Sequence, residues 1–111
     1  MYRSIRLFDG RDLWFEEYGD PGGDPVMLFH GMPACSLLFA FLDDIATEVG
    51  VRAVAPDRPG VRLSTFQPNR RVIDWPNDCS ALADQLGFDR FGIFAWSGGS
   101  PCALAAAARS A

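Results

Sequence analysis

The sequence predicts an α/β fold in which an antiparallel hairpin is followed by parallel strands that alternate with helices. Asp9-Gly10 is a strong hairpin-turn signal between two strand-like segments near the start of the chain. Three short apolar runs follow, and a segment with helical character comes after each of them. The 111 residues, 49% hydrophobic and 22% charged, are enough for one domain, which we expect to span residues 1–111.

The hairpin and the first parallel strand are predicted from their side-chain patterns. The segments YRSIRLF (2–8) and DLWFEEYG (12–19) flank the Asp9-Gly10 turn, and DPGGDP then forms a loop. Val26 to Phe29 is a continuous apolar run closed by His30. Such a run is typical of a strand that is covered on both faces.

A helix is predicted to begin at Ser36 and to end at Gly50, which stands where a C-cap glycine would. Its apolar face is expected from the residues that recur at helical spacing: Leu38, Phe41, Leu42, Ile45 and Val49.

The remaining elements repeat the same alternation of strand and helix. VRAVAP reads as a buried strand, and a long loop follows it. Asp74 can cap a helix that buries Cys79, Leu82 and Leu86 and ends at Gly87. The predicted ranges are 51–56 for this strand, 57–71 for the loop, 91–96 for the strand FGIFAW, and 97–111 for the last helix.

Composition excludes several classes of function. The net charge of -4, without a basic stripe, argues against binding of nucleic acid. No apolar run reaches the ~18 residues of a membrane helix, and the N-terminus shows no secretory h-region. All ten basic residues are arginines, so no P-loop or Schiff-base lysine is present. We therefore expect neither a membrane nor a nucleic-acid partner.

The cysteines predict no metal site and no cofactor. Cys35, Cys79 and Cys102 are odd in number and widely spaced, without a CxxC pair or an accompanying histidine cluster. Buried thiols in a reducing compartment are the simplest explanation, and this predicts a cytoplasmic protein.

Ser97 lies at the junction between the strand FGIFAW and an alanine-rich helix. In a nucleophile elbow, G-x-S-x-G, a serine occupies a strained turn, and small residues two positions before and after it let the turn close. Here Ala95 and Gly99 hold those positions. We expect a positive φ at Ser97, whose Oγ would stand clear of strand and helix. The alternative is a plain helix N-cap.

A second turn, HGMP (30–33), follows the first parallel strand. Acyl transfer needs two backbone N–H donors aimed at the developing oxyanion. The N–H groups of Gly98 and Met32 are placed to supply them, because Pro33 has none. His30 and Asp57 are assigned structural roles, in which they bond loop backbone.

Together, LFHGMP, VAPDRPGVRLS and WSGGSPC resemble the N-terminal half of the α/β-hydrolase superfamily, closest to proline-iminopeptidase-like serine hydrolases. The resemblance implies that Ser97 is the nucleophile and that Met32 and Gly98 form the oxyanion hole. Relatives that attack with aspartate, such as haloalkane dehalogenases and epoxide hydrolases, fit a serine less well. The chain departs from the family loop D-x-x-G-x-G-x-S at Arg62, and Ala34 stands where glycine is common.

In this fold the acid and then the histidine base follow the serine along the chain. Neither an acidic residue nor a histidine follows Ser97. We therefore expect a partial domain, truncated after the nucleophile-elbow helix and inactive alone. Its parent protein would cleave an ester, amide or related acyl bond of a small-molecule substrate through an acyl-serine intermediate. The alternative is a non-catalytic α/β module for binding or assembly. A Rossmann domain fits poorly, because G-x-G-x-x-G does not occur.

Overall fold

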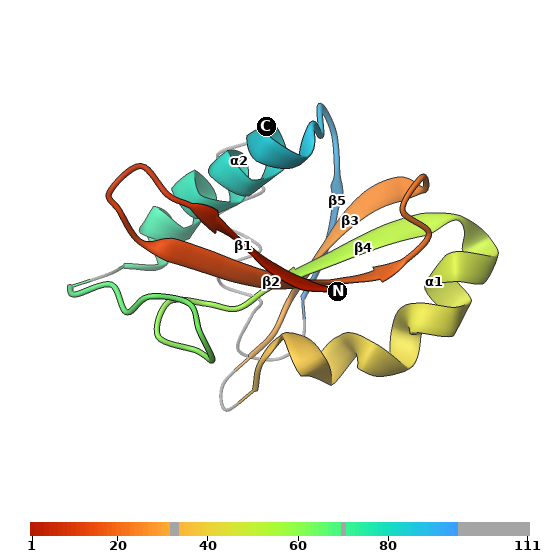
Figure 1. The fold of residues 1–111 in the computed structure, drawn as a ribbon, viewed down its shortest axis with the longest axis horizontal. Coiled ribbons are helices and arrows are strands. Elements are labelled where there is room, and N and C mark those ends of the chain that lie inside the picture. The colour runs from red at the N-terminus through yellow and green to blue at the C-terminus, as the bar shows by residue number, and fades with distance from the viewer. Residues whose placement is uncertain (32–33, 70, 96–111) are drawn as a thin grey trace.

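A computed structural model describes residues 1–31, 34–69 and 71–95, and within them five strands form one sheet with helices on both faces (Figure 1). The strands are β1 (Tyr2–Arg6), β2 (Asp12–Gly19), β3 (Asp24–Phe29), β4 (Val51–Pro56) and β5 (Gly92–Ala95). The helices are η1 (Ser36–Leu42), α1 (Asp43–Val49), η2 (Val72–Asp74) and α2 (Trp75–Leu86), where η marks a 3₁₀-helix. Within these ranges, none of the helices combines the length and apolar character that a membrane crossing requires.

The sheet order is β1-β2-β4-β3-β5. β1 and β2 pair as an antiparallel hairpin, and β2 is also antiparallel to β4. β3 pairs in parallel with β4 on one side and with β5 on the other. The predicted hairpin and the predicted parallel strands are thus confirmed. The position of β4 between β2 and β3 could not be predicted from the order of the elements along the chain.

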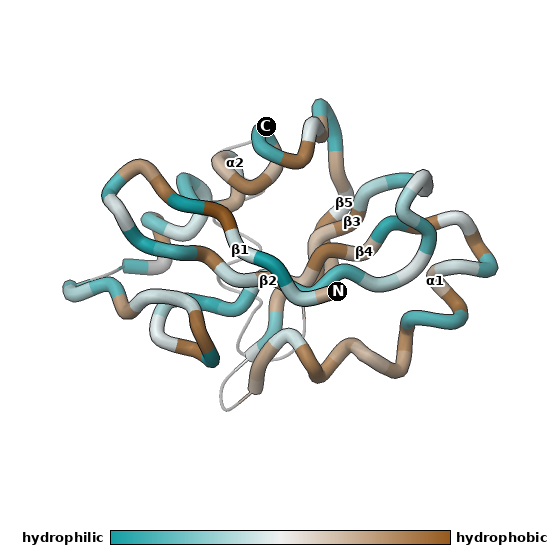
Figure 2. Tube along the Cα trace, viewed as in Figure 1, coloured by the Kyte–Doolittle hydropathy of each residue, from teal (hydrophilic) through white to brown (hydrophobic). Residues whose placement is uncertain are grey.

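Side chains alternate between the two faces of the sheet, so each central strand contributes to two cores. Met27 and Phe29 belong to the cluster that α2 covers, whereas Leu28 belongs to the cluster around Phe39 of η1. Figure 2 shows the apolar residues running through the central strands. This arrangement explains why Val26 to Phe29 is apolar without interruption.

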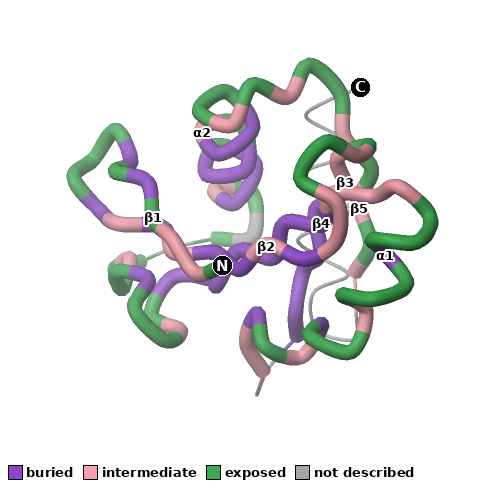
Figure 3. The backbone as a smooth tube through the Cα atoms, turned by 45° about the vertical axis from the view of Figure 1, so that its right-hand side comes forward, coloured by how far each residue is buried: buried purple, intermediate pink, exposed green. Residues whose placement is uncertain are grey.

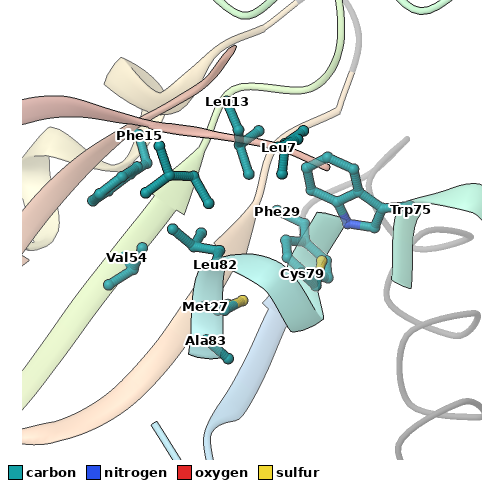
Figure 4. Packing of buried hydrophobic residues seen from close by; sticks show 11 residues of the cluster. Leu7, Leu13, Phe15, Met27, Phe29, Val54, Trp75, Cys79, Leu82 and Ala83 are labelled. Atoms are coloured by element: carbon teal, nitrogen blue, oxygen red, sulfur yellow. The ribbon is translucent and has the colours of Figure 1, made fainter. Parts of the chain in front are cut away.

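Helix α2 packs against the sheet with one buried side, as Figures 3 and 4 show. Phe29 and Trp75 meet edge to face, with ring centroids 5.5 Å apart. The predicted burial of Cys79 and Leu82 is confirmed. The buried members of this cluster are Ile5, Leu7, Leu13, Phe15, Met27, Phe29, Val54, Trp75, Cys79, Leu82 and Ala83.

Both predicted C-cap glycines are confirmed, because Gly50 and Gly87 adopt left-handed conformations with φ of 75° and 78°. Asp74 does precede α2, but its side chain makes no capping hydrogen bond. Its carboxylate accepts the backbone N–H of Arg71 instead, at 2.8 Å. The predicted capping role of Asp74 is therefore wrong.

The segment from Ser36 to Val49 was predicted as one helix, but it is a 3₁₀-helix followed by a short α-helix. The predicted apolar face is confirmed only in part, because Leu38 and Leu42 pack against the core, whereas Phe41, Ile45 and Val49 are each more than half exposed. A 3₁₀-helix has three residues per turn, so the buried pair in η1 is Ser36 and Phe39. Figure 3 shows how little of α1 is buried compared with α2.

Candidate active site

The parallel strands bring the ends of β3, β4 and β5 to one edge of the sheet, where ligands bind in open α/β folds. In the strand register, Phe29 is the partner of Ala95, so β3 and β5 end side by side. Met32 lies three positions after Phe29, and Gly98 lies three positions after Ala95. Met32, Ser97 and Gly98 themselves lie outside the described residues, so their roles and the expected positive φ at Ser97 stay predictions.

His30 directly follows β3 and is fully buried. Its Nε2 accepts the backbone N–H of Arg58 at 3.1 Å. The neutral ring therefore carries its proton on Nδ1, which donates to the carbonyl oxygen of Gly31 at 2.9 Å. Burial lowers the pKa of His30, although the bond to Gly31 and the nearby Asp57 charge act in the opposite direction. These contacts confirm the predicted structural role for His30.

We expect mild acid to destabilise the fold through His30, the only histidine in the chain. The unfolded side chain takes up a proton near pH 6.5, whereas the folded one has a lowered pKa and stays neutral. The unfolded state then binds more protons, so stability falls as the pH drops below about 6.5, by at most about 1.4 kcal/mol per unit. Urea denaturation between pH 7.5 and 5 measures this slope. His30→Gln should flatten it, and an equally steep slope in that variant would contradict the assignment.

Asp57 directly follows β4 and is also fully buried. Its Oδ1 accepts the backbone N–H of Ser36 at 2.7 Å, and its Oδ2 accepts the hydroxyl of Tyr2 at 2.7 Å. Hydrogen bonds of this kind are what allow a carboxylate to be buried. Asp57 thus ties the loop after β4 to the start of η1, which confirms its predicted structural role.

The loop that begins at Asp57 closes on itself. Ser64 Oγ donates to the carbonyl oxygen of Asp57 at 2.8 Å and accepts the backbone N–H of Trp14 at 2.9 Å. Gly60 has a φ of 81°, and Arg62 has a φ of 49°. Positions 60 and 62, where the family pattern D-x-x-G-x-G-x-S has glycine, therefore both adopt the left-handed conformation. At position 62 this conformation strains the arginine backbone by about 1–2 kcal/mol.

Sequence reasoning missed the partners of this loop. Tyr2 and Asp57 are 55 residues apart, and Ser36 and Asp57 are 21 apart. Tyr18 adds a hydrogen bond from its hydroxyl to the carbonyl oxygen of Ser36, at 2.9 Å. No local pattern marks these residues, because each gains its role only when the sheet and the helical layer come together.

The thiols and carboxylates give little indication of a metal. Within residues 1–31, 34–69 and 71–95, no group of three His, Cys, Asp or Glu side chains could hold a metal ion. Cys79 is buried, as expected, whereas Cys35 is half-buried and unpaired. Cys102 lies outside the described residues.

Comparison with known proteins places residues 24–110 in the family described as "alpha/beta hydrolase fold". A proline iminopeptidase of Xanthomonas citri is 36% identical over 112 residues, covering 95% of this chain and 34% of that protein. A haloalkane dehalogenase of Psychrobacter cryohalolentis is 32% identical over 88 residues, covering 72% and 28%. The solved esterase EaEST of Exiguobacterium antarcticum is 26% identical with a TM-score of 0.79, covering 96% and 39%.

The chain therefore spans about a third of the length of the curated relatives it matches. In solved structures the shared region extends over nearly the whole chain. The hairpin, the crossover order of the strands and the two helical layers described above thus correspond to the N-terminal part of that fold.

Proposed function

The chain belongs to the alpha/beta hydrolase fold family, and on this premise we propose that it carries the nucleophile and the oxyanion-hole turn of a serine hydrolase. The reaction is cleavage of an ester, amide or related acyl bond in a small molecule. Ser97 Oγ gives its proton to the base of the whole protein and attacks the carbonyl carbon, and the N–H groups of Met32 and Gly98 stabilise the oxyanion. The scissile C–O or C–N bond then breaks, and the leaving alcohol or amine takes up that proton. The acyl-Ser97 intermediate is then hydrolysed by water.

The observation that carries this proposal is the pairing of Phe29 with Ala95 at the ends of β3 and β5. It brings the strand that leads to Ser97 next to the strand that leads to the HGMP turn (30–33), whose Met32 N–H is the proposed second oxyanion donor. The relatives named as a proline iminopeptidase and an esterase support hydrolysis of an acyl bond. The haloalkane dehalogenase relative belongs to a class that attacks with aspartate. This chain has Ser97 at the proposed nucleophile position, which favours the serine mechanism.

The acid and the base are not supplied by residues that follow Ser97 in this chain. His30 does not fit the role of base, because both of its ring nitrogens bond backbone groups. We therefore propose that these 111 residues alone have less than about 1 part in 10³ of the activity of the whole protein. The three cysteines Cys35, Cys79 and Cys102 are odd in number and widely spaced, which favours a reducing, cytoplasmic location.

The test is covalent trapping of the nucleophile in the whole protein with a fluorophosphonate, followed by mass spectrometry of the modified peptide. Ser97 is expected to carry the label, and Ser97→Ala is expected to lose it together with at least ~10³-fold of p-nitrophenyl acetate hydrolysis. Ser100→Ala, three positions away, is the matched control and should keep both.

Absence of label and of Ser97-dependent turnover would favour a non-catalytic α/β module, which is the alternative from the sequence. Substantial turnover by the 111 residues alone, abolished by Ser97→Ala, would show that another group acts as the base. That outcome would contradict the structural role assigned to His30.

A further inference from the structure

Arg62 has a backbone conformation that favours glycine, yet its side chain makes several contacts with other residues. Its φ is 49°, and the family pattern has glycine at this position. Arg62 lies at the exposed surface of the described chain, but its side chain is only 29% exposed because it contacts Tyr2, Ser36 and Asp57. A strained residue of this kind points to a function for the side chain.

The guanidinium of Arg62 contacts Tyr2 and Ser36, which donate hydrogen bonds to the carboxylate of Asp57. Its central carbon lies 3.8 Å from the centroid of the Tyr2 ring, which is a close cation–π contact. Its Nη1 donates to Ser36 Oγ at 3.1 Å and lies 3.9 Å from Asp57 Oδ2. Because Tyr2 and Ser36 both donate to the buried carboxylate, the arginine completes a closed network around one negative charge.

This network holds one end of the turn that contains Met32. All three polar groups of Ser36 are engaged: its N–H by Asp57, its carbonyl oxygen by Tyr18, and its Oγ by Arg62. The other end of the turn is held by His30, whose ring accepts the N–H of Arg58. His30 and Ser36, which flank this turn, are therefore both bonded to the loop that begins at Asp57.

We propose that Arg62 is a positioning residue, which holds Ser36 in place and so supports the role of oxyanion donor proposed above for Met32. This inference rests on the proposed function of that turn. It assigns a role to a departure from the family pattern, because glycine at position 62 could adopt the backbone angle but could not bridge Tyr2 and Ser36. Arg62 acts through Ser36 and does not itself contact the substrate.

The test uses two variants that remove the guanidinium but differ in backbone strain. Arg62→Gly relieves the left-handed strain, and Arg62→Ala keeps it. Both are expected to speed hydrogen exchange of the Ser36 amide by at least about 10-fold relative to amides of β2 and β4. In the whole protein both should lower kcat by about 10- to 100-fold, with a smaller change in KM, because misplaced donors weaken only transition-state binding.

Asn69→Gly is the matched control. Among the described residues, Asn69 is the second non-glycine residue with a positive φ, of 55°. This substitution should leave Ser36 exchange and kcat unchanged. The proposal is overturned if Ser36 exchange in Arg62→Gly matches the wild type, or if exchange rises while kcat stays unchanged. If wild-type turnover does not depend on Ser97, the proposed function fails separately, and Ser36 exchange alone still decides whether Arg62 holds the turn.

Discussion

Arg11→Ala is expected to lower the free energy of unfolding by about 3–5 kcal/mol, because it leaves a buried carboxylate without its partner. Arg11 donates to both oxygens of Asp78, at 2.8 and 3.1 Å, and its Nε donates to Asp9 at 2.8 Å. The side chains of Arg11 and Asp78 are only 10% and 6% exposed. This pair fastens the hairpin to α2 across 67 residues of sequence.

The pH dependence of this loss follows from the same burial. Burial raises the pKa of Asp78, and Arg11 partly offsets that effect. A carboxyl whose pKa is raised in the folded state destabilises the fold as the pH rises towards that folded-state pKa. Removal of Arg11 raises the folded-state pKa of Asp78 further, because Arg11 favours the charged carboxylate. The deficit of Arg11→Ala should thus be largest near pH 7 and should shrink as the pH falls and Asp78 becomes protonated.

The matched control is Arg6→Ala, which breaks another Arg–Asp pair in the same hairpin. Arg6 Nε lies 2.6 Å from Asp12 Oδ1, but the two side chains are 69% and 40% exposed. Water screens such a pair, so we expect a cost below about 1 kcal/mol. Urea denaturation measures the free energy of unfolding of both variants. Equal losses would show that the buried pair stabilises the fold no more than the exposed pair does. Arg11→Met combined with Asp78→Leu should recover much of the lost stability.

Phe29→Ala is expected to cost about 3–5 kcal/mol through loss of burial and formation of a cavity. Phe29 is fully buried at the end of β3 and packs edge to face against Trp75 (Figure 4). Because Phe29 also pairs with Ala95, the cavity would form beside the strand ends that lead to the candidate site. Thermal or urea unfolding measures the loss.

Phe41→Ala is the control for this second prediction, since it removes the same side chain from a residue that is 74% exposed. It should change the free energy of unfolding by no more than about 0.5 kcal/mol. A large loss at Phe41 would contradict the observed exposure and would restore the apolar face that the sequence predicted for this helix.

Local patterns in the sequence determined the kinds of element and many of their limits. A continuous apolar run shows that a strand is covered on both faces, whatever lies next to it, so β3 could be predicted from Val26 to Phe29. Gly50 and Gly87 mark helix ends because the left-handed cap conformation strongly favours glycine. Ser97, Met32 and Gly98 likewise come from sequence motifs and remain predictions.

Only the tertiary structure decided which of these elements are neighbours and which partners the buried polar groups have. β4 lies between β2 and β3, and Tyr2, Ser36 and Arg62 gather around Asp57. These contacts join residues far apart in sequence, and no periodicity of side chains reports on them. The exposure of Phe41 was misjudged for a related reason. The 3.6-residue period of an α-helix was assumed, whereas packing against the sheet favours a 3₁₀ turn that buries Ser36 and Phe39 instead.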